Sequence, residues 1–156
     1  MPISVIGHTR LPSEEDLRAL EQELGADLPG DYRAFLAKFN GGRPEPNWFP
    51  VSGEMQMGAV NLFYGLRQVG EWDDLLTQRQ YLLNRMPGHM VPIAEAACGN
   101  VVCLSLGDMD YGVVYHWDHE LEAGEDEEPT YSNLFEVADS FSAFFESIRQ
   151  GLPPGI

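Results

Sequence analysis

A short segment near residue 118 has the residue types that could hold a metal ion. His116, Asp118 and Glu120 alternate along the chain, so in an extended strand their side chains would lie on one face. Imidazole and carboxylate groups are common zinc ligands, and Asp108 and Asp110 nearby could add oxygen ligands. The other interpretation is a polar sheet face whose charges are solvated. Because the chain has no HExxH motif, EF-hand loop or paired CxxC motifs, we predict neither a metal nor another cofactor.

The two cysteines do not form a convincing nucleophilic site. Cys103 lies within the apolar segment 101–106, which predicts a small core residue. Cys98 precedes Gly99-Asn100 in a predicted turn, with no His or cation close in sequence that would activate its thiol. The chain also lacks a GxSxG elbow, a Walker loop and a dinucleotide fingerprint. We therefore predict that the protein is not an enzyme, with a metal-dependent hydrolase that uses His116, Asp118 and Glu120 as a remaining alternative.

Charge is distributed very unevenly along the 156 residues. The net charge is −16, and residues 86–148 contain 13 of the 25 acids but no Lys or Arg. This argues against binding to DNA, RNA or an anionic membrane, because Lys and Arg supply the affinity for phosphate groups. A field of one sign attracts an oppositely charged partner, so a basic protein is favoured. The alternative is that the acidity only keeps the protein soluble.

The elements that must position these residues begin with two short helices. Ser13 and Asp16 have the spacing of a capping box, and Gly25 is a natural helix stop. Leu28-Pro29-Gly30 predicts a tight turn into a second helix from about residue 31, which Asn40-Gly41-Gly42 ends. The helices would form a hairpin that packs on something larger.

A sheet and two further helices are predicted after residue 44. The β-type segments are 48–51, 59–64, 90–94, 101–106, 111–117 and 134–137, the last as an edge strand. Residues 107–110 would connect a hairpin. A helix is predicted over 71–86, with Trp72, Leu75, Leu76, Leu82, Leu83 and Met86 buried, and another begins at Asp139 or Ser140. This order predicts an α+β fold, with helices on one face of a mainly antiparallel sheet.

Location is predicted from what the sequence lacks. No apolar run approaches the roughly 18 residues of a membrane span. Residues 1–12 show no basic region followed by an apolar stretch, and two cysteines make no disulfide framework. These features predict a cytoplasmic protein.

Four segments together resemble a known family. They are residues 24–36 (LGADLPGDYRAFL) closing on Asn40-Gly41-Gly42; 91–94 through Gly99-Asn100 to 104–106; 112–120 (GVVYHWDHE); and 137–141 with Phe144-Phe145 and Ile148. In order and spacing they resemble the SUKH superfamily, which includes fungal cell-wall regulators of the Smi/Knr type and many bacterial immunity proteins. The acidic insert at 122–128 departs from the family pattern, and residues 54–86 match nothing firmly.

The resemblance implies a single SUKH-like domain over residues 1–156, with a core at about 13–150 and no catalytic activity. Its bacterial members are antidotes to toxins, many of them nucleases or deaminases that must be basic to hold phosphate. We therefore expect an immunity protein whose partner is a cognate basic toxin domain; the alternative is an intracellular regulator of the Smi/Knr type. The expected partner-binding residues are Asp108, Asp110, Asp118, Glu120, Glu125, Asp126, Glu127 and Glu128, with Trp117 or Trp48 as an anchor if it is not part of the core.

Overall fold

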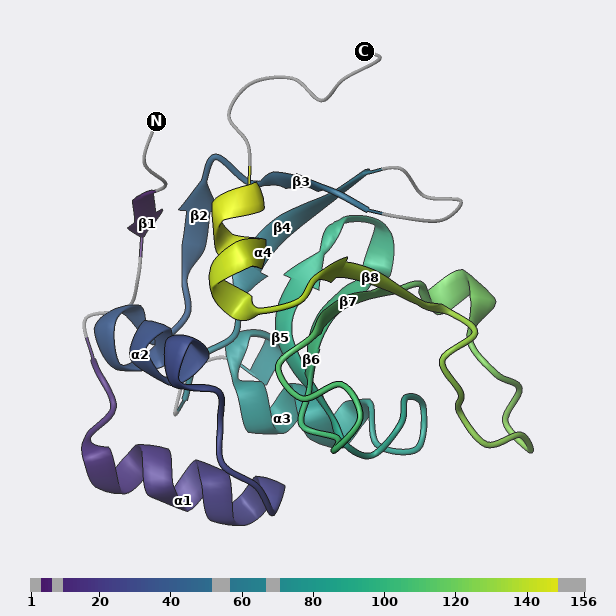
Figure 1. Cartoon of the computed structure of the whole chain (residues 1–156), viewed down its shortest axis with the longest axis horizontal. Coiled ribbons are helices and arrows are strands. Elements are labelled where there is room, and N and C mark those ends of the chain that lie inside the picture. Colours follow the sequence, from purple (N-terminus) through teal and green to yellow (C-terminus); the bar gives the residue numbers. More distant parts are fainter. Residues whose placement is uncertain (1–3, 7–9, 52–56, 67–70, 149–156) are drawn as a thin grey trace.

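A six-stranded antiparallel sheet forms the centre of the fold (Figure 1). The computed structural model describes residues 4–6, 10–51, 57–66 and 71–148. The sheet strands are β3 (Trp48–Pro50), β4 (Met57–Phe63), β5 (Met90–Ala96), β6 (Val101–Ser105), β7 (Val114–Trp117) and β8 (Leu134–Ala138). They lie in sequence order across the sheet, and every neighbouring pair is antiparallel. The predicted α+β class is confirmed, and β8 is an edge strand as expected.

Helices and a small second sheet surround this curled sheet. The helices are α1 (Glu14–Leu24), α2 (Gly30–Phe39), α3 (Leu75–Tyr81) and α4 (Phe141–Ser147), with short 3-10 helices η1 (Glu71–Asp73), η2 (Ala97–Gly99) and η3 (His119–Leu121). The small sheet pairs β1 (Ser4–Ile6) with β2 (Arg43–Glu45). Ser13 and Asp16 form the predicted capping box, and Gly25 adopts a left-handed conformation at the end of α1. Helix α2 ends at Asn40-Gly41-Gly42 as predicted, but Asn40, as well as the two glycines, has a positive φ there.

The larger core lies between the sheet and helices α1, α2 and α4. The ring of Phe35 in α2 packs at a tilt against Phe63 of β4 and Phe141 of α4, with 4.8 and 5.0 Å between ring centroids. Phe144 closes the cluster against Phe49 of β3 at 5.0 Å. These contacts explain the helical spacing of aromatic residues in the sequence, since a stripe at every third or fourth position faces one side.

A second core lies on the opposite face of the sheet. Val101, Cys103, Tyr115 and Trp117 alternate with the residues of the larger core and are covered by neighbours that include Leu82 and Met86. Residues of β6 and β7 are therefore buried on both faces of the sheet. The predicted arrangement, with helices on one face, did not include this second core. The expectation that Cys103 is a core residue is confirmed.

The predicted helix over 71–86 is wrong in extent. It breaks after η1, because the Asp74 side chain accepts hydrogen bonds from the backbone and hydroxyl of Thr77 and so begins a new helix. Since α3 ends at Tyr81, one stripe cannot bury every apolar residue. Leu75, Leu82 and Met86 are buried as expected, whereas Trp72, Leu76 and Leu83 are exposed.

The predicted four-residue connection at 107–110 is also wrong. Strand β6 ends at Ser105 and β7 begins at Val114, so residues 106–113 join them. The loop folds back because the Asp110 carboxylate accepts a hydrogen bond from the Ser105 hydroxyl at 2.5 Å, and Gly112 takes a positive φ of 88°.

Candidate functional site

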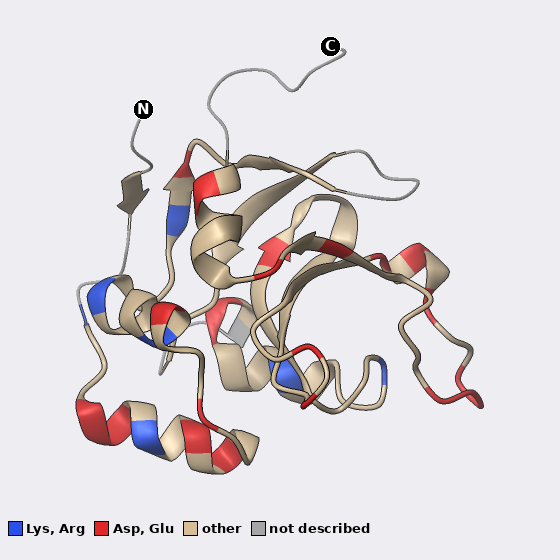
Figure 2. Cartoon of the chain, in the orientation of Figure 1, with Lys and Arg blue, Asp and Glu red and all other residues tan. Residues whose placement is uncertain are grey.

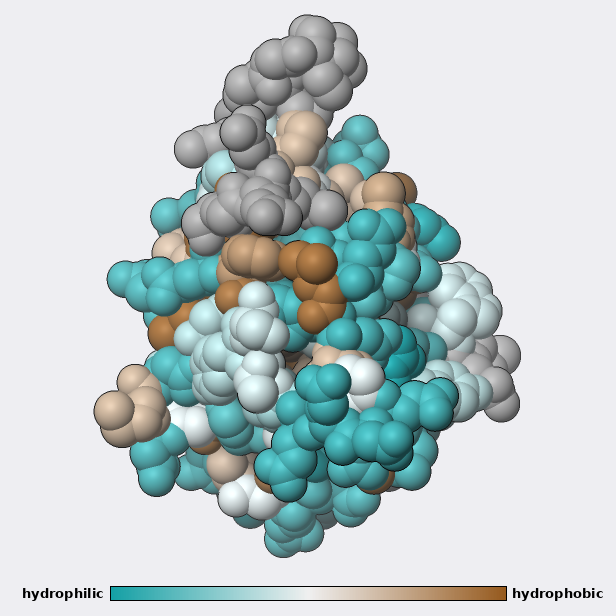
Figure 3. Space-filling model, turned by 90° about the vertical axis from the view of Figure 1, so that its right-hand side faces the viewer, coloured by the Kyte–Doolittle hydropathy of each residue, from teal (hydrophilic) through white to brown (hydrophobic). Residues whose placement is uncertain are grey.

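The exposed carboxylates predicted to bind a partner lie on the connections around β7 and β8. Asp108 is in the loop between β6 and β7, Glu120 is in η3, and the run from Glu125 to Glu128 is in the following loop, which projects at the right of Figure 2. All six side chains are exposed; as a name for this set of residues we use the acidic face: Asp108, Glu120, Glu125, Asp126, Glu127 and Glu128. The side that carries the projecting loop is mostly hydrophilic, with a small hydrophobic area (Figure 3).

Asp110 lies at the centre of an internal hydrogen-bond network. Its carboxylate accepts bonds from Ser105, from the Tyr115 hydroxyl at 2.7 Å and from the Tyr131 hydroxyl at 2.8 Å. Burial opposes the charge, but these three bonds prevail and lower the pKa of Asp110. The Tyr131 hydroxyl also lies 2.5 Å from Nε2 of His89. Asp110 therefore connects three parts of the chain and positions the loop that carries Asp108.

Asp118 also has a structural role in the fold. Its carboxylate accepts a hydrogen bond from the backbone N–H of Glu120 at 3.0 Å and caps η3. Its backbone N–H and C=O bond to the backbone and side chain of Asn133 at 3.0 Å each. These contacts join the residue before η3 to the end of the loop 122–133, which we call the acidic loop.

The two tryptophans proposed as anchors lie in different environments. Trp117 is 1% exposed and belongs to the second core, so it forms no part of the acidic face. Trp48 is half-buried in the edge strand β3. The connections that carry the acidic face do expose other large apolar or aromatic side chains: Met109, which is 97% exposed, and Tyr111, Leu121 and Tyr131. These residues were not among the predicted binding residues, although the position of Met109 between Asp108 and Asp110 in a turn indicated exposure.

The sequence pattern that suggested a metal site is broken in the structure. Strand β7 ends at Trp117, so Asp118 and Glu120 do not continue its alternation. His116 is fully buried against Phe49, with 5.9 Å between ring centroids. Across the part of the chain that the structure describes, no three His, Cys, Asp or Glu side chains group so as to hold a metal ion.

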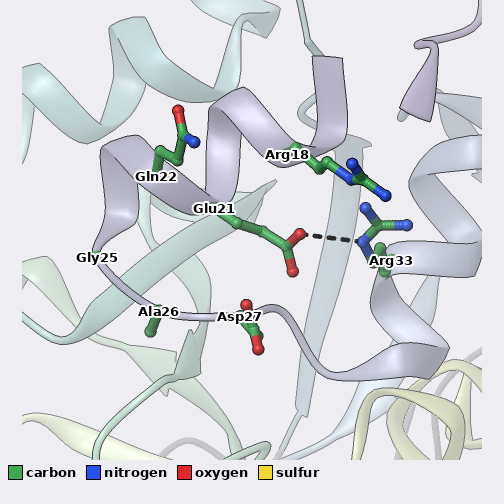
Figure 4. Close-up of a pocket in the computed structure, with 7 residues that line it drawn as sticks. All are labelled: Arg18, Glu21, Gln22, Gly25, Ala26, Asp27 and Arg33. Atoms are coloured by element: carbon green, nitrogen blue, oxygen red, sulfur yellow. Dashed lines mark hydrogen bonds and ion pairs between the residues drawn. The ribbon is translucent and has the colours of Figure 1, made fainter. Parts of the chain in front are cut away.

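A hollow of about 480 Å³ lies between α1 and α2, and the ion pair of Glu21 and Arg33 forms part of its lining (Figure 4). The Arg33 guanidinium bonds to both oxygens of Glu14 and, through Nε, to Glu21 at 3.2 Å. The second oxygen of Glu21 accepts the backbone N–H of Leu28 at 2.7 Å. Arg33, Glu14 and Glu21 already bond to one another, so we interpret them as contacts that hold α1 against α2 and not as a ligand site.

None of the described helices combines the length and the apolar character that crossing a membrane requires.

Comparison with known proteins agrees with the sequence segments described above. The pattern of the SMI1 / KNR4 family (SUKH-1) matches residues 11–147, a range that runs from before α1 to the end of α4. The chain is also 30% identical over 159 residues to the SPbeta prophage-derived uncharacterized protein YokK of Bacillus subtilis (strain 168), covering 89% of this chain and 77% of that protein. The chain therefore belongs to the SMI1 / KNR4 (SUKH-1) family.

Proposed function

We propose that this protein is a cytoplasmic immunity protein that neutralises a cognate basic toxin domain by binding it, without catalysis. The observation that carries the proposal is the acidic face, whose six exposed carboxylates belong to a stretch, 86–148, that contains no Lys or Arg. Membership of a family whose bacterial members include antidotes supports the same function.

Electrostatics explains how such a face would act. A toxin that cleaves or deaminates nucleic acid needs Lys and Arg to hold phosphate. The acidic face presents negative charge to those residues and competes with the substrate, and a strong field raises the association rate by about 10- to 1,000-fold. The exposed Met109 and Tyr131 supply apolar contact at the same surface.

The internal bonds of Asp110 and Asp118 support this role because they hold the charged loops in place before binding. Arg85 adds a further tie by forming two bonds to Glu122, at 2.9 and 3.2 Å, at the start of the acidic loop. A preformed surface loses less conformational entropy on binding. We propose that these residues position the acidic face, while the exposed acids contact the toxin.

The family also includes regulators, and gene context separates the two possibilities. An immunity protein should be encoded beside a large secreted protein with a variable C-terminal domain, whereas a regulator of the Smi/Knr type should have a resident partner and no adjacent toxin gene. That neighbouring C-terminal domain is the partner to use in the binding test.

The test neutralises four charges of the acidic face without changing their shape. Glu125→Gln, Asp126→Asn, Glu127→Gln and Glu128→Gln together should slow association with the toxin domain about tenfold or more at low salt, with a smaller effect at high salt. Stopped-flow fluorescence measures both rates. The matched control removes four exposed acids from α1 and the region of α4, with Glu15→Gln, Glu23→Gln, Asp139→Asn and Glu146→Gln. An unchanged association rate, or an equal loss in the control, would overturn the proposed face.

A further inference from the structure

A second hollow, of about 440 Å³, lies on the face of the sheet that carries the second core. Its base follows from strand register. Glu95 of β5 pairs with Val101 of β6, and Val101 pairs with Trp117 of β7, so the three side chains form a row across neighbouring strands. Tyr64, which follows β4, lines the same hollow, as does Asn100 beside η2.

One wall comes from α3 and the turn after it. Gln78, Tyr81 and Arg85 line the hollow, and Tyr81 is 55% exposed, so its ring is accessible from solvent. Arg85 already illustrates a mode of binding that this surface supports. Its guanidinium carbon lies 5.4 Å from the centre of the Trp117 ring, and its nitrogens bond to the Glu122 carboxylate. One guanidinium is thus held between an aromatic ring and a carboxylate.

Glu95 is the carboxylate of the hollow that has no partner. Its side chain is partly buried, and it makes no hydrogen bond or ion pair within the described chain. The Glu95 charge acts on the Tyr64 hydroxyl, whose pKa is raised by burial and by this carboxylate. Because Glu122 offsets the charge of Arg85, the lining has one uncompensated negative charge beside exposed and buried aromatic rings. That combination suits a cation, since aromatic faces and carboxylates both attract one.

We propose that this hollow receives an arginine side chain of the partner protein, with the guanidinium on Glu95 and against Tyr81. Arginine fits better than lysine because its planar group stacks on an aromatic ring while its N–H groups bond in a fork to a carboxylate. The hollow also lies close to the acidic face. The side chain of Asn100, a buried residue of the lining, accepts a hydrogen bond from the backbone N–H of His119 in η3 at 3.1 Å, and Arg85 of the lining bonds to Glu122, which begins the acidic loop. A basic surface that covers the acidic face is therefore well placed to insert one side chain here.

This inference rests on the proposed function for the identity of the partner, but a small probe tests the hollow without any toxin. We would titrate the full chain with Nα-acetyl-arginine methylamide and follow backbone amides and tryptophan indole N–H groups by NMR. Nα-acetyl-citrulline methylamide, which has the same shape without the charge, is the control ligand. Glu95→Gln and Tyr81→Ala test the lining, and Glu23→Gln removes the same charge from an exposed position on α1.

We expect saturable shifts at the Trp117 indole and at the amides of Glu95, Gly99 and Val101, with at least fivefold weaker binding in each lining variant and no change in Glu23→Gln. An equal response to the citrulline probe, unchanged affinity in Glu95→Gln, or shifts confined to the acidic face would overturn the inference.

The two proposals fail separately. With a toxin domain, Glu95→Gln should raise the dissociation rate about tenfold, whereas neutralising residues 125–128 should lower the association rate. If only the association rate stays unchanged when residues 125–128 are neutralised, the acidic face is contradicted. If only the dissociation rate stays unchanged in Glu95→Gln, the arginine site is contradicted.

Discussion

The buried ring of His116 provides a test of the physical reasoning that is independent of any partner. The ring is 0% exposed, and neither nitrogen has a hydrogen-bond partner among the described residues. Burial lowers the pKa of His116, and the nearby Asp118 charge opposes this without reversing it. At pH 7.5 the folded protein therefore holds a neutral imidazole, buried without a hydrogen bond from the described residues.

The expected magnitude follows from that arrangement. An unsatisfied buried polar group costs about 1–3 kcal/mol, so His116→Leu should stabilise the protein by about that amount at pH 7.5. For a chain of this length the gain corresponds to roughly 2–4 °C in Tm for each kcal/mol. Because the folded pKa is lowered, the unfolded chain takes up a proton below about pH 6.5 that the folded chain resists, so the wild type loses stability as pH falls. The loss approaches about 1.4 kcal/mol per pH unit.

Urea denaturation between pH 7.5 and 5 measures both effects. The free-energy difference between His116→Leu and the wild type should widen as pH falls. His116→Gln is the informative control: it keeps a polar group in the core but cannot titrate, so it should remove the pH dependence of this site without the stability gain. A difference between His116→Leu and the wild type that stays constant over this pH range would refute the argument.

Two further predictions concern buried polar contacts. The Asn40 side chain donates hydrogen bonds to the backbone carbonyls of Arg10 and Leu66 and accepts one from the Leu66 N–H at 2.7 Å. Asn40→Ala should therefore lower the free energy of unfolding, measured in urea, by about 2–4 kcal/mol. Asn40→Asp should have an intermediate effect, because it keeps the acceptor. Asp110→Asn should cost about 1.5–3 kcal/mol at pH 7, because it weakens three bonds to a charged carboxylate. Since the pKa of Asp110 is lowered on folding, this contribution is present above about pH 4 and disappears as pH falls through the folded value; a difference that persists unchanged at pH 2 would contradict it.

Local signals were sufficient to predict the ends of the first two helices. The capping bonds of Ser13 with Asp16, of Gly25 and of Asn40 join residues at most four positions apart, and both helices end where the sequence predicts. The segment 71–86 failed because its outcome depends on tertiary contacts. Apolar residues there are too frequent to indicate which of them faces the sheet, and the Asp74 cap divides what the sequence presents as one helix.

The candidate site divides in the same way. The run at 125–128 is exposed, as its composition suggests, because four consecutive carboxylates have no means of being buried together. Asp110 and Asp118 are also acids, like the exposed residues of that run, yet their carboxylates accept hydrogen bonds from within the protein. The donors lie up to 21 residues away in sequence. Charge alone did not distinguish an acid that faces solvent from one that holds the backbone in place. The alternation of His116, Asp118 and Glu120 likewise gave no indication that β7 ends at Trp117.

Internal contacts explain how the loops that carry the six exposed carboxylates stay folded despite their charge. Repulsion among the six carboxylates of the acidic face favours loop opening, because like charges destabilise a compact state. Three separate contacts oppose it: Asn133 bonds to Asp118, Arg85 bonds to Glu122, and Tyr131 bonds to Asp110. Each contact lies beside the exposed charges and uses none of them. A residue change at a contact should therefore weaken partner binding by loosening the surface, whereas a change at an exposed acid should weaken it by reducing the field. Salt dependence distinguishes the two, because salt screens the field of exposed charges more strongly than it screens short, partly buried contacts.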